Sequence, residues 1–170
     1  MKRSLLALPM LFVFAVSLAA GAALPTVKTV KNTDLGTILV NSTGRTLYHI
    51  TTDAGHKISC AGSCAAVWPP LLVAAGAKPV AGTGITAAKL SVVKRPDGSS
   101  QVTYNGMTLY RYSGDAKAGQ TNGEGIQSKW FAVSSAGKIV KPAAASSSGG
   151  LGSSGYGTTT GSSSGGYGYG

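Results

Sequence analysis

The chain has 170 residues, enough for one domain of ordinary size with a single core. Its 15 Lys and Arg residues outnumber its 5 Asp and Glu residues, which gives a formal net charge of +10 at pH 7. The basic residues are scattered and not gathered with aromatic residues on one stripe, which argues against a nucleic-acid-binding protein. We expect a diffuse positive charge without a function of its own. The alternative is a weak, salt-sensitive attraction to anionic wall polymers or lipid headgroups.

The segment 1–23 predicts a secretory signal peptide. Lys2 and Arg3 precede an apolar run that ends in small residues suited to cleavage. A retained membrane anchor is the alternative, but Pro9 and Gly21 interrupt the run, whereas a span needs about 20 apolar residues. No cysteine follows the run for lipid attachment. We therefore expect a protein without a transmembrane span after cleavage that is secreted, periplasmic or at the cell surface.

Two copies of one pattern follow. The stretch TLYHITTDAG at 46–55 recurs as TLYRYSGDAK at 108–117. A gapless alignment of 36–68 with 98–130 pairs Gly36 with Gly98, Val40 with Val102, Gly44 with Gly106, and Trp68 with Trp130. This constant offset indicates an internal duplication in which each unit supplies half of one core. Repeat 1 is expected at about 36–73 and repeat 2 at about 98–137.

Local patterns predict strands. SQVTYNGMTLYRY alternates on both sides of Asn105-Gly106, a strong hairpin signal. KLSVVKRPDGSSQV and WFAVSSAGKIV predict two more strand-turn-strand units, and the first copy has a looser turn, NSTGR. Only the region near 60–67 suggests a turn or two of helix. We expect a mainly β fold over 24–141, with two pseudo-symmetric β repeats packed as one small sandwich or barrel-like domain and at most short helices.

Aromatic residues alternate along the repeated strand. Period two places Tyr48 with Ile50, and Tyr110 with Tyr112, on one face, while Leu47 with His49, and Leu109 with Arg111, point the other way. We expect the tyrosine face to pack inward, with its hydroxyls hydrogen-bonded at the edge. A stacking platform for a sugar or planar ligand, together with Trp68 and Trp130, is the alternative, although aromatic residues at strand period are more often part of the core.

Asp53 and Asp115 each end a copy of this strand. An aspartate at such a position forms a turn by bonding the backbone two residues on. A carboxylate pair related by the repeat, as in a glycosidase or an aspartic dyad, is the alternative. Because both lie at turns, we predict structural roles and no catalytic residue.

Both cysteines, Cys60 and Cys64, lie in the first copy only, within HKISCAGSCAAVWPP. In an exported protein an isolated close pair is most simply a disulfide. A soft-metal or redox site that adds His49 and His56 is the alternative, but the spacing matches no common zinc pattern. We predict a Cys60–Cys64 bridge that fixes the irregular segment carrying Trp68, Pro69 and Pro70, and neither metal nor cofactor.

The end of the chain has a different composition. Of the last 25 residues, 18 are Gly or Ser. Such a segment buries too little apolar surface to offset the entropy of ordering it. We expect a disordered Gly/Ser/Tyr-rich tail over 142–170.

The chain resembles a family of predicted bacterial lipoproteins known as the secreted repeat of unknown function. The resemblance rests on a Tyr-x-aromatic-x-x-Asp motif, which residues 110–115 match fully, whereas residues 48–53 carry Ile50 in place of the aromatic. The segments CAGSCAAVWPPL, KRPDGSSQVTYNGMTLYRYSGD and TNGEGIQSKWF extend the similarity over about 36–137. It implies a bacterial envelope or secreted protein of tandem repeats, and it implies no activity.

From these observations we expect a non-enzymatic binding or interaction module of the envelope or the extracellular space. Its ligand is unknown; an anionic wall polymer or a glycan would suit the charge. A structural or adhesive surface protein that acts through its tail is the second hypothesis. A metal-binding, haem-binding or hydrolytic protein is the third.

Overall fold

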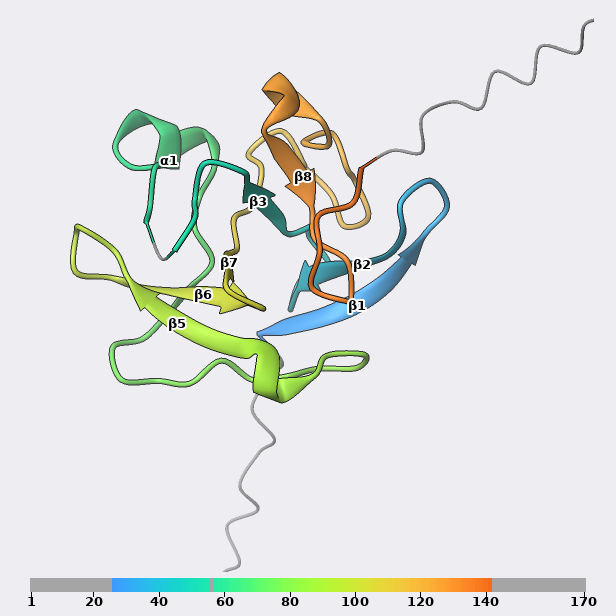
Figure 1. The fold of residues 1–170 in the computed structure, drawn as a ribbon. Coiled ribbons are helices and arrows are strands. Elements are labelled where there is room, and N and C mark those ends of the chain that lie inside the picture. The colour runs from blue at the N-terminus through green and yellow to red at the C-terminus, as the bar shows by residue number, and fades with distance from the viewer. Residues whose placement is uncertain (1–25, 56, 142–170) are drawn as a thin grey trace, which may run out of the picture.

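The computed structural model of the protein describes residues 26–55 and 57–141. The predicted signal peptide, His56 and the predicted tail therefore lie outside the described residues. Strands predominate and the helices are short, which confirms the mainly β prediction (Figure 1). In chain order the elements are β1 (Val27–Asn32), β2 (Gly36–Asn41), β3 (Tyr48–Ile50), α1 (Ser63–Val67), β4 (Leu72–Val73), a 3-10 turn (Ala87–Lys89), β5 (Leu90–Lys94), β6 (Ser100–Tyr104), β7 (Met107–Thr108), a second 3-10 turn (Ile126–Ser128) and β8 (Trp130–Ala132).

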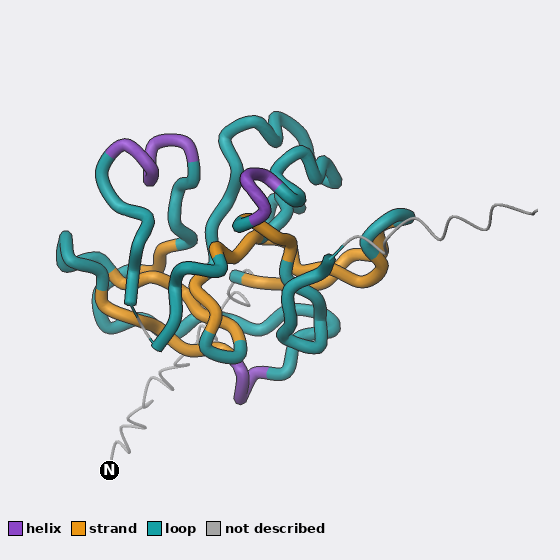
Figure 2. The backbone as a smooth tube through the Cα atoms, turned by 45° about the horizontal axis from the view of Figure 1, so that its top comes forward, coloured by secondary structure: helices purple, strands orange, loops and turns teal. Residues whose placement is uncertain are grey.

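The described strands form three small sheets, none of which closes into a barrel. β1 and β2 make an antiparallel hairpin, β3 pairs with β8, and β4, β6 and β5 lie in that order with β7 also paired to β6. Figure 2 shows the helical turns at the outside of the molecule, with the strands between them and long loops connecting them. Because the sheets are small, loop backbone carries many of the contacts that join the two halves.

The hairpins β1–β2 and β5–β6 are copies of each other. Val27 pairs with Asn41 and Leu90 pairs with Tyr104, so these two pairs occupy equivalent positions. Equivalent residues of the two hairpins lie one position further apart in the sequence than equivalent residues of the later strands. The reason is that the connection after β2 is one residue longer than the tight turn after β6. The gapless alignment is therefore wrong by one position before this turn. The structural equivalent of Val102 is Leu39 and not Val40.

Hydrogen bonds of equivalent backbone groups support this correction. Leu39 donates to the carbonyl of Val133 and Val102 donates to that of Leu71, both at 2.8 Å. The acceptors Val133 and Leu71 are themselves equivalent, since they keep the offset of the later strands. β1 itself is absent from the sequence prediction, since Val27 alone among its residues is buried and its apolar pattern is weak.

The two halves are intertwined around a pseudo-twofold axis. Tyr48 N–H donates to the carbonyl of Tyr110 at 2.8 Å, and Tyr110 N–H donates back to Tyr48 at 2.9 Å. Beyond this pair, β3 of the first half is paired with β8 of the second. In the reciprocal place, Tyr110 bridges to Pro70 of the first half. Each repeated strand thus pairs with the end of the other repeat, so neither half completes its sheet alone.

Most side chains on both faces of the repeated strand are buried. The tyrosine face packs inward as predicted, since Tyr48 and Tyr110 are fully buried. On the opposite face Leu47 and Leu109 are also fully buried, whereas Arg111 is exposed. Two apolar clusters result. One contains Ile38, Tyr48, Ile50, Cys60, Trp68, Tyr110, Trp130 and Ala132; the other contains Val27, Leu39, Leu47, Val102, Tyr104, Leu109 and Val133.

Candidate functional site

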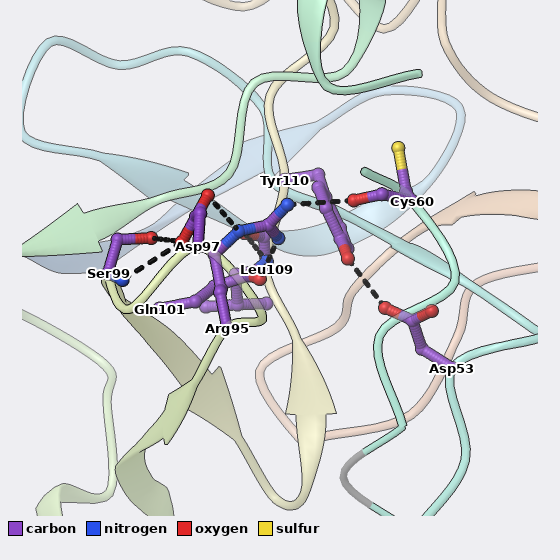
Figure 3. Close-up of polar contacts among 8 residues, drawn as sticks. All are labelled: Asp53, Cys60, Arg95, Asp97, Ser99, Gln101, Leu109 and Tyr110. Atoms are coloured by element: carbon purple, nitrogen blue, oxygen red, sulfur yellow. Dashed lines mark hydrogen bonds and ion pairs between the residues drawn. The ribbon is translucent and has the colours of Figure 1, made fainter. Parts of the chain in front are cut away.

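The tyrosine and aspartate of the repeated motif are bonded across the two halves. Tyr48 Oη donates to Asp115 Oδ2 at 2.7 Å, and Tyr110 Oη donates to Asp53 Oδ2 at 2.6 Å. Figure 3 shows the second of these bonds. Within each copy, the N–H groups of Asp53 and Asp115 donate to the carbonyls of Ile50 and Tyr112, respectively. The motif therefore forms its turn locally and places its carboxylate against the tyrosine of the other copy.

Further donors surround Asp53. Its Oδ1 accepts bonds from the amide and the hydroxyl of Ser59, both at 2.6 Å, and its Oδ2 accepts one from Thr108 Oγ1 at 2.7 Å. Asp115 Oδ1 accepts a bond from the amide of Asn122 at 2.9 Å. Both aspartates are buried. These contacts supply no solvent-facing acid and base, so the geometry does not favour a catalytic dyad.

Burial raises the pKa values of the two motif tyrosines and of Asp115. Burial, followed by the bond to Asp53, raises the pKa of Tyr110 to about 12. Burial and the neighbouring carboxylate of Asp115 also raise the pKa of Tyr48. The pKa of Asp115 is raised by burial, against the lowering effect of its bond from Tyr48. Both tyrosines are neutral donors at physiological pH.

The two tryptophans stack on each other at the pseudo-twofold axis. The ring centroids of Trp68 and Trp130 are 3.8 Å apart, with 2° between the ring planes. Tyr48 meets Trp68 edge-on at 5.6 Å, and Tyr110 meets Trp130 edge-on at 5.3 Å. Trp68 is 5% exposed and Trp130 is 2% exposed. The stack belongs to the core, and the tryptophan faces are not an open platform for a ligand.

The predicted Cys60–Cys64 disulfide is present, with a Cα–Cα distance of 5.2 Å. Bridged cysteines offer no thiolate, so the alternative metal site of His49, His56, Cys60 and Cys64 is not supported. His49 is buried, and its Nδ1 lies 3.1 Å from the carbonyl oxygen of Thr108. Burial lowers the pKa of His49. In the described part of the chain, no group of three His, Cys, Asp or Glu side chains is placed to hold a metal ion.

A buried arginine joins the disulfide loop to the second hairpin. Arg95 Nη2 donates to the carbonyl of Cys60 at 2.8 Å, and Nη1 donates to Gln101 Oε1 at 2.5 Å (Figure 3). Its Nε lies 3.5 Å from Asp97 Oδ2, and its guanidinium carbon is 6.0 Å from the ring centroid of Tyr110. Sequence reasoning missed this residue, since it precedes Pro96 in a segment that predicts only a turn. Basic residues are rarely buried without partners.

An open hollow of about 560 Å³ lies beside the tryptophan stack. Its apolar lining comes from both halves, and its polar lining consists of hydroxyls, one amide and one ammonium. The lining residues are Ile50, Thr52, Ser59, Ser63, Cys64, Val67, Trp68, Gln127, Lys129 and Trp130. Gln127 and the adjacent Ser128 have φ values of 53° and 54°, in the left-handed region that non-glycine residues rarely adopt. Sequence reasoning did not predict this hollow, because its walls meet only after the halves intertwine.

Comparison with known proteins gives one family. The family described as "secreted repeat of unknown function" matches the chain twice, at residues 29–72 and 91–134, which together are more than half of the sequence. The two matches have the same offset as the repeated TLY segments. Neither the curated proteins nor the solved structures include a match. Within 26–55 and 57–141, no helix has the length and apolar character needed to cross a bilayer.

Proposed function

The chain belongs to the family of secreted repeats of unknown function, and from that premise we propose that it is a non-enzymatic binding module of the bacterial envelope or the extracellular space. Its family makes it an extracytoplasmic protein. The hollow beside the tryptophan stack is its binding site.

The lining of the hollow carries this proposal. Ligand sites are commonly clefts of about 300–1,000 Å³ with an apolar lining and a few polar groups that orient the ligand. The hollow has this size and composition. Its apolar floor is built from the tryptophan stack and the disulfide, which are held by buried contacts from both halves. A floor so fixed loses little conformational entropy when a ligand binds.

The bonding of the motif aspartates supports binding over hydrolysis. A general acid or base must reach the proton that it transfers. Asp53 and Asp115 are instead buried and accept bonds from Tyr110 and Tyr48. Their chemistry is used inside the fold, where they join the two halves.

Charge indicates the kind of ligand. Lys129 is the one charged residue among the described residues that line the hollow, and the whole chain is strongly basic. An anionic wall polymer or an acidic glycan fits both features, through one local contact and a long-range attraction that salt would weaken.

Tryptophan fluorescence provides a direct test, because the chain contains two tryptophans and both line the hollow. We expect isolated wall polymer or acidic glycan fragments to change the emission in a saturable manner, and the affinity to fall as salt rises. Lys129→Ala should weaken binding, whereas Lys138→Ala, an exposed lysine outside the lining, should not. Binding that is equally affected by both substitutions would assign it to diffuse charge and reject the hollow.

A further inference from the structure

We propose that the hollow accepts a single aromatic ring carrying an anionic group, held where the other half of the protein holds the ring of Tyr112. This inference rests on the proposed function, since it concerns the same hollow, and it adds a second ligand class, a small aromatic anion, to the wall polymer or acidic glycan. It comes from a difference between the two halves at one pair of equivalent positions.

A tyrosine of the second half covers the tryptophan of the first half. The ring of Tyr112 lies against Trp68 with centroids 4.4 Å apart and planes tilted by 30°. The equivalent residue of the first half is Ile50, which is paired in register with Trp130 and lines the hollow. Isoleucine has no ring to extend over the tryptophan. One side of the stack is therefore covered by an aromatic side chain, whereas the equivalent position holds the smaller, aliphatic Ile50, which borders the hollow together with Trp130.

The two halves also differ at the residue two positions after Tyr112 and Ile50. A Cβ atom at Gly114 would clash with the ring of Tyr112, so the tyrosine conformation requires a glycine there. The equivalent residue in the first half is Thr52, which also lines the hollow. Tyr112 with Gly114 is thus a filled arrangement, and Ile50 with Thr52 is its counterpart beside the hollow.

The hollow therefore borders the equivalents of two residues that lie against the ring of Tyr112. Thr52 and Trp130 line the hollow, and they are the equivalents of Gly114 and Trp68. A ligand ring placed there would repeat an aromatic contact that the fold already makes once. Aromatic pairs in offset or edge-on geometry stabilise a contact beyond what their buried area contributes.

The anionic group follows from the rim of the hollow. Lys129 lines it and is exposed, and none of the described lining residues is acidic. Its equivalent, Val67, lines the same hollow and carries no charge. A ring with a carboxylate would place the ring over the apolar floor and the carboxylate toward the Lys129 ammonium. The hydroxyls of Thr52 and Ser63 offer further donors.

Calorimetric titration of the full chain with 4-hydroxybenzoate tests the inference, with benzyl alcohol and cyclohexanecarboxylate as probes that lack the charge or the aromatic ring. We expect one site for 4-hydroxybenzoate and binding of each other probe weaker by about tenfold or more, equivalent to about 1.4 kcal/mol. The variant Ile50→Tyr with Thr52→Gly copies the filled arrangement and should lose the site. Lys129→Gln, which leaves the core untouched, should weaken 4-hydroxybenzoate and leave the binding of the uncharged benzyl alcohol unchanged.

Three results would overturn the inference. They are absence of saturable 4-hydroxybenzoate binding, equal binding of cyclohexanecarboxylate, or binding that neither the filled variant nor Lys129→Gln weakens. If the filled variant fails to fold, Lys129→Gln and the probe comparison still decide. Parallel titration with wall polymer separates the two proposals. If Lys129→Ala weakens polymer binding while 4-hydroxybenzoate does not bind, the ring inference fails and the binding module stands.

Discussion

Replacing Asp53 with alanine should destabilise the protein strongly, because four hydrogen bonds end on this carboxylate. Two of the donors, the hydroxyls of Thr108 and Tyr110, are buried. Each buried donor left without an acceptor costs about 1–3 kcal/mol, so we expect a loss of about 2–6 kcal/mol. Asp115→Ala should cost less, about 1–3 kcal/mol, since one buried hydroxyl, that of Tyr48, depends on it.

Urea unfolding monitored by tryptophan fluorescence measures both losses. Asp34→Ala, at an exposed residue of the first hairpin turn, is the control and should change stability by no more than about 0.5 kcal/mol. A double-mutant cycle then tests whether each aspartate accepts its bond from the tyrosine of the other half. Asp53→Ala should couple to Tyr110→Phe and be nearly additive with Tyr48→Phe. Coupling of Asp53 to Tyr48 instead would refute the crossed arrangement.

Other predictions concern the disulfide, pH and one glycine. Thiol titration of the unfolded, unreduced protein should find no free thiol at Cys60 or Cys64, and replacing both by alanine should cost less than the ~3 kcal/mol expected for a 15-residue loop; two reactive thiols would contradict the bridge. Burial lowers the pKa of His49 in the folded protein below 6.5. The stability that the neutral His49 contributes is therefore complete above pH 6.5, and it is lost as the pH falls through the pKa of the folded state. Urea midpoints below pH 6.5 should therefore depend on pH less in His49→Gln than in the wild type, and equal slopes would speak against a buried neutral histidine. Gly114→Ala should destabilise by about 1–3 kcal/mol through overpacking against the ring of Tyr112, and the added substitution Tyr112→Ala should remove most of that penalty in thermal unfolding; a penalty that persists would place the clash elsewhere.

The sequence predicts those features that depend on local pattern or on spacing. The duplication follows from a constant offset, the inward tyrosine face from strand period, and the Cys60–Cys64 bridge from an isolated pair in an exported chain. The crossed bonds do not follow, because Tyr48 and Tyr110 stand in the same local pattern. Nothing in that pattern states which aspartate each tyrosine meets.

Other features of the protein could be recognised only in the folded structure. Leu39, and not Val40, is the structural equivalent of Val102, which is a shift of one position from the gapless alignment. The sequence does not reveal this shift, because both residues are apolar and either one matches Val102 equally well. Arg95 is a charged residue in a turn segment, and its burial depends on Gln101 and the Cys60 carbonyl, which reach it from other parts of the fold. The hollow likewise exists only after Trp68 and Trp130 meet.

Wall-polymer binding by the filled variant tests the central claim most directly. Ile50→Tyr with Thr52→Gly changes the hollow without altering the chain's charge or the motif tyrosines and aspartates. With urea stability and near-ultraviolet circular dichroism used to show that the variant is folded, co-sedimentation with isolated cell wall should be lost or reduced by about tenfold or more, equivalent to about 1.4 kcal/mol. Co-sedimentation equal to that of the wild type at the same salt concentration would contradict the account, because binding would then not need the hollow.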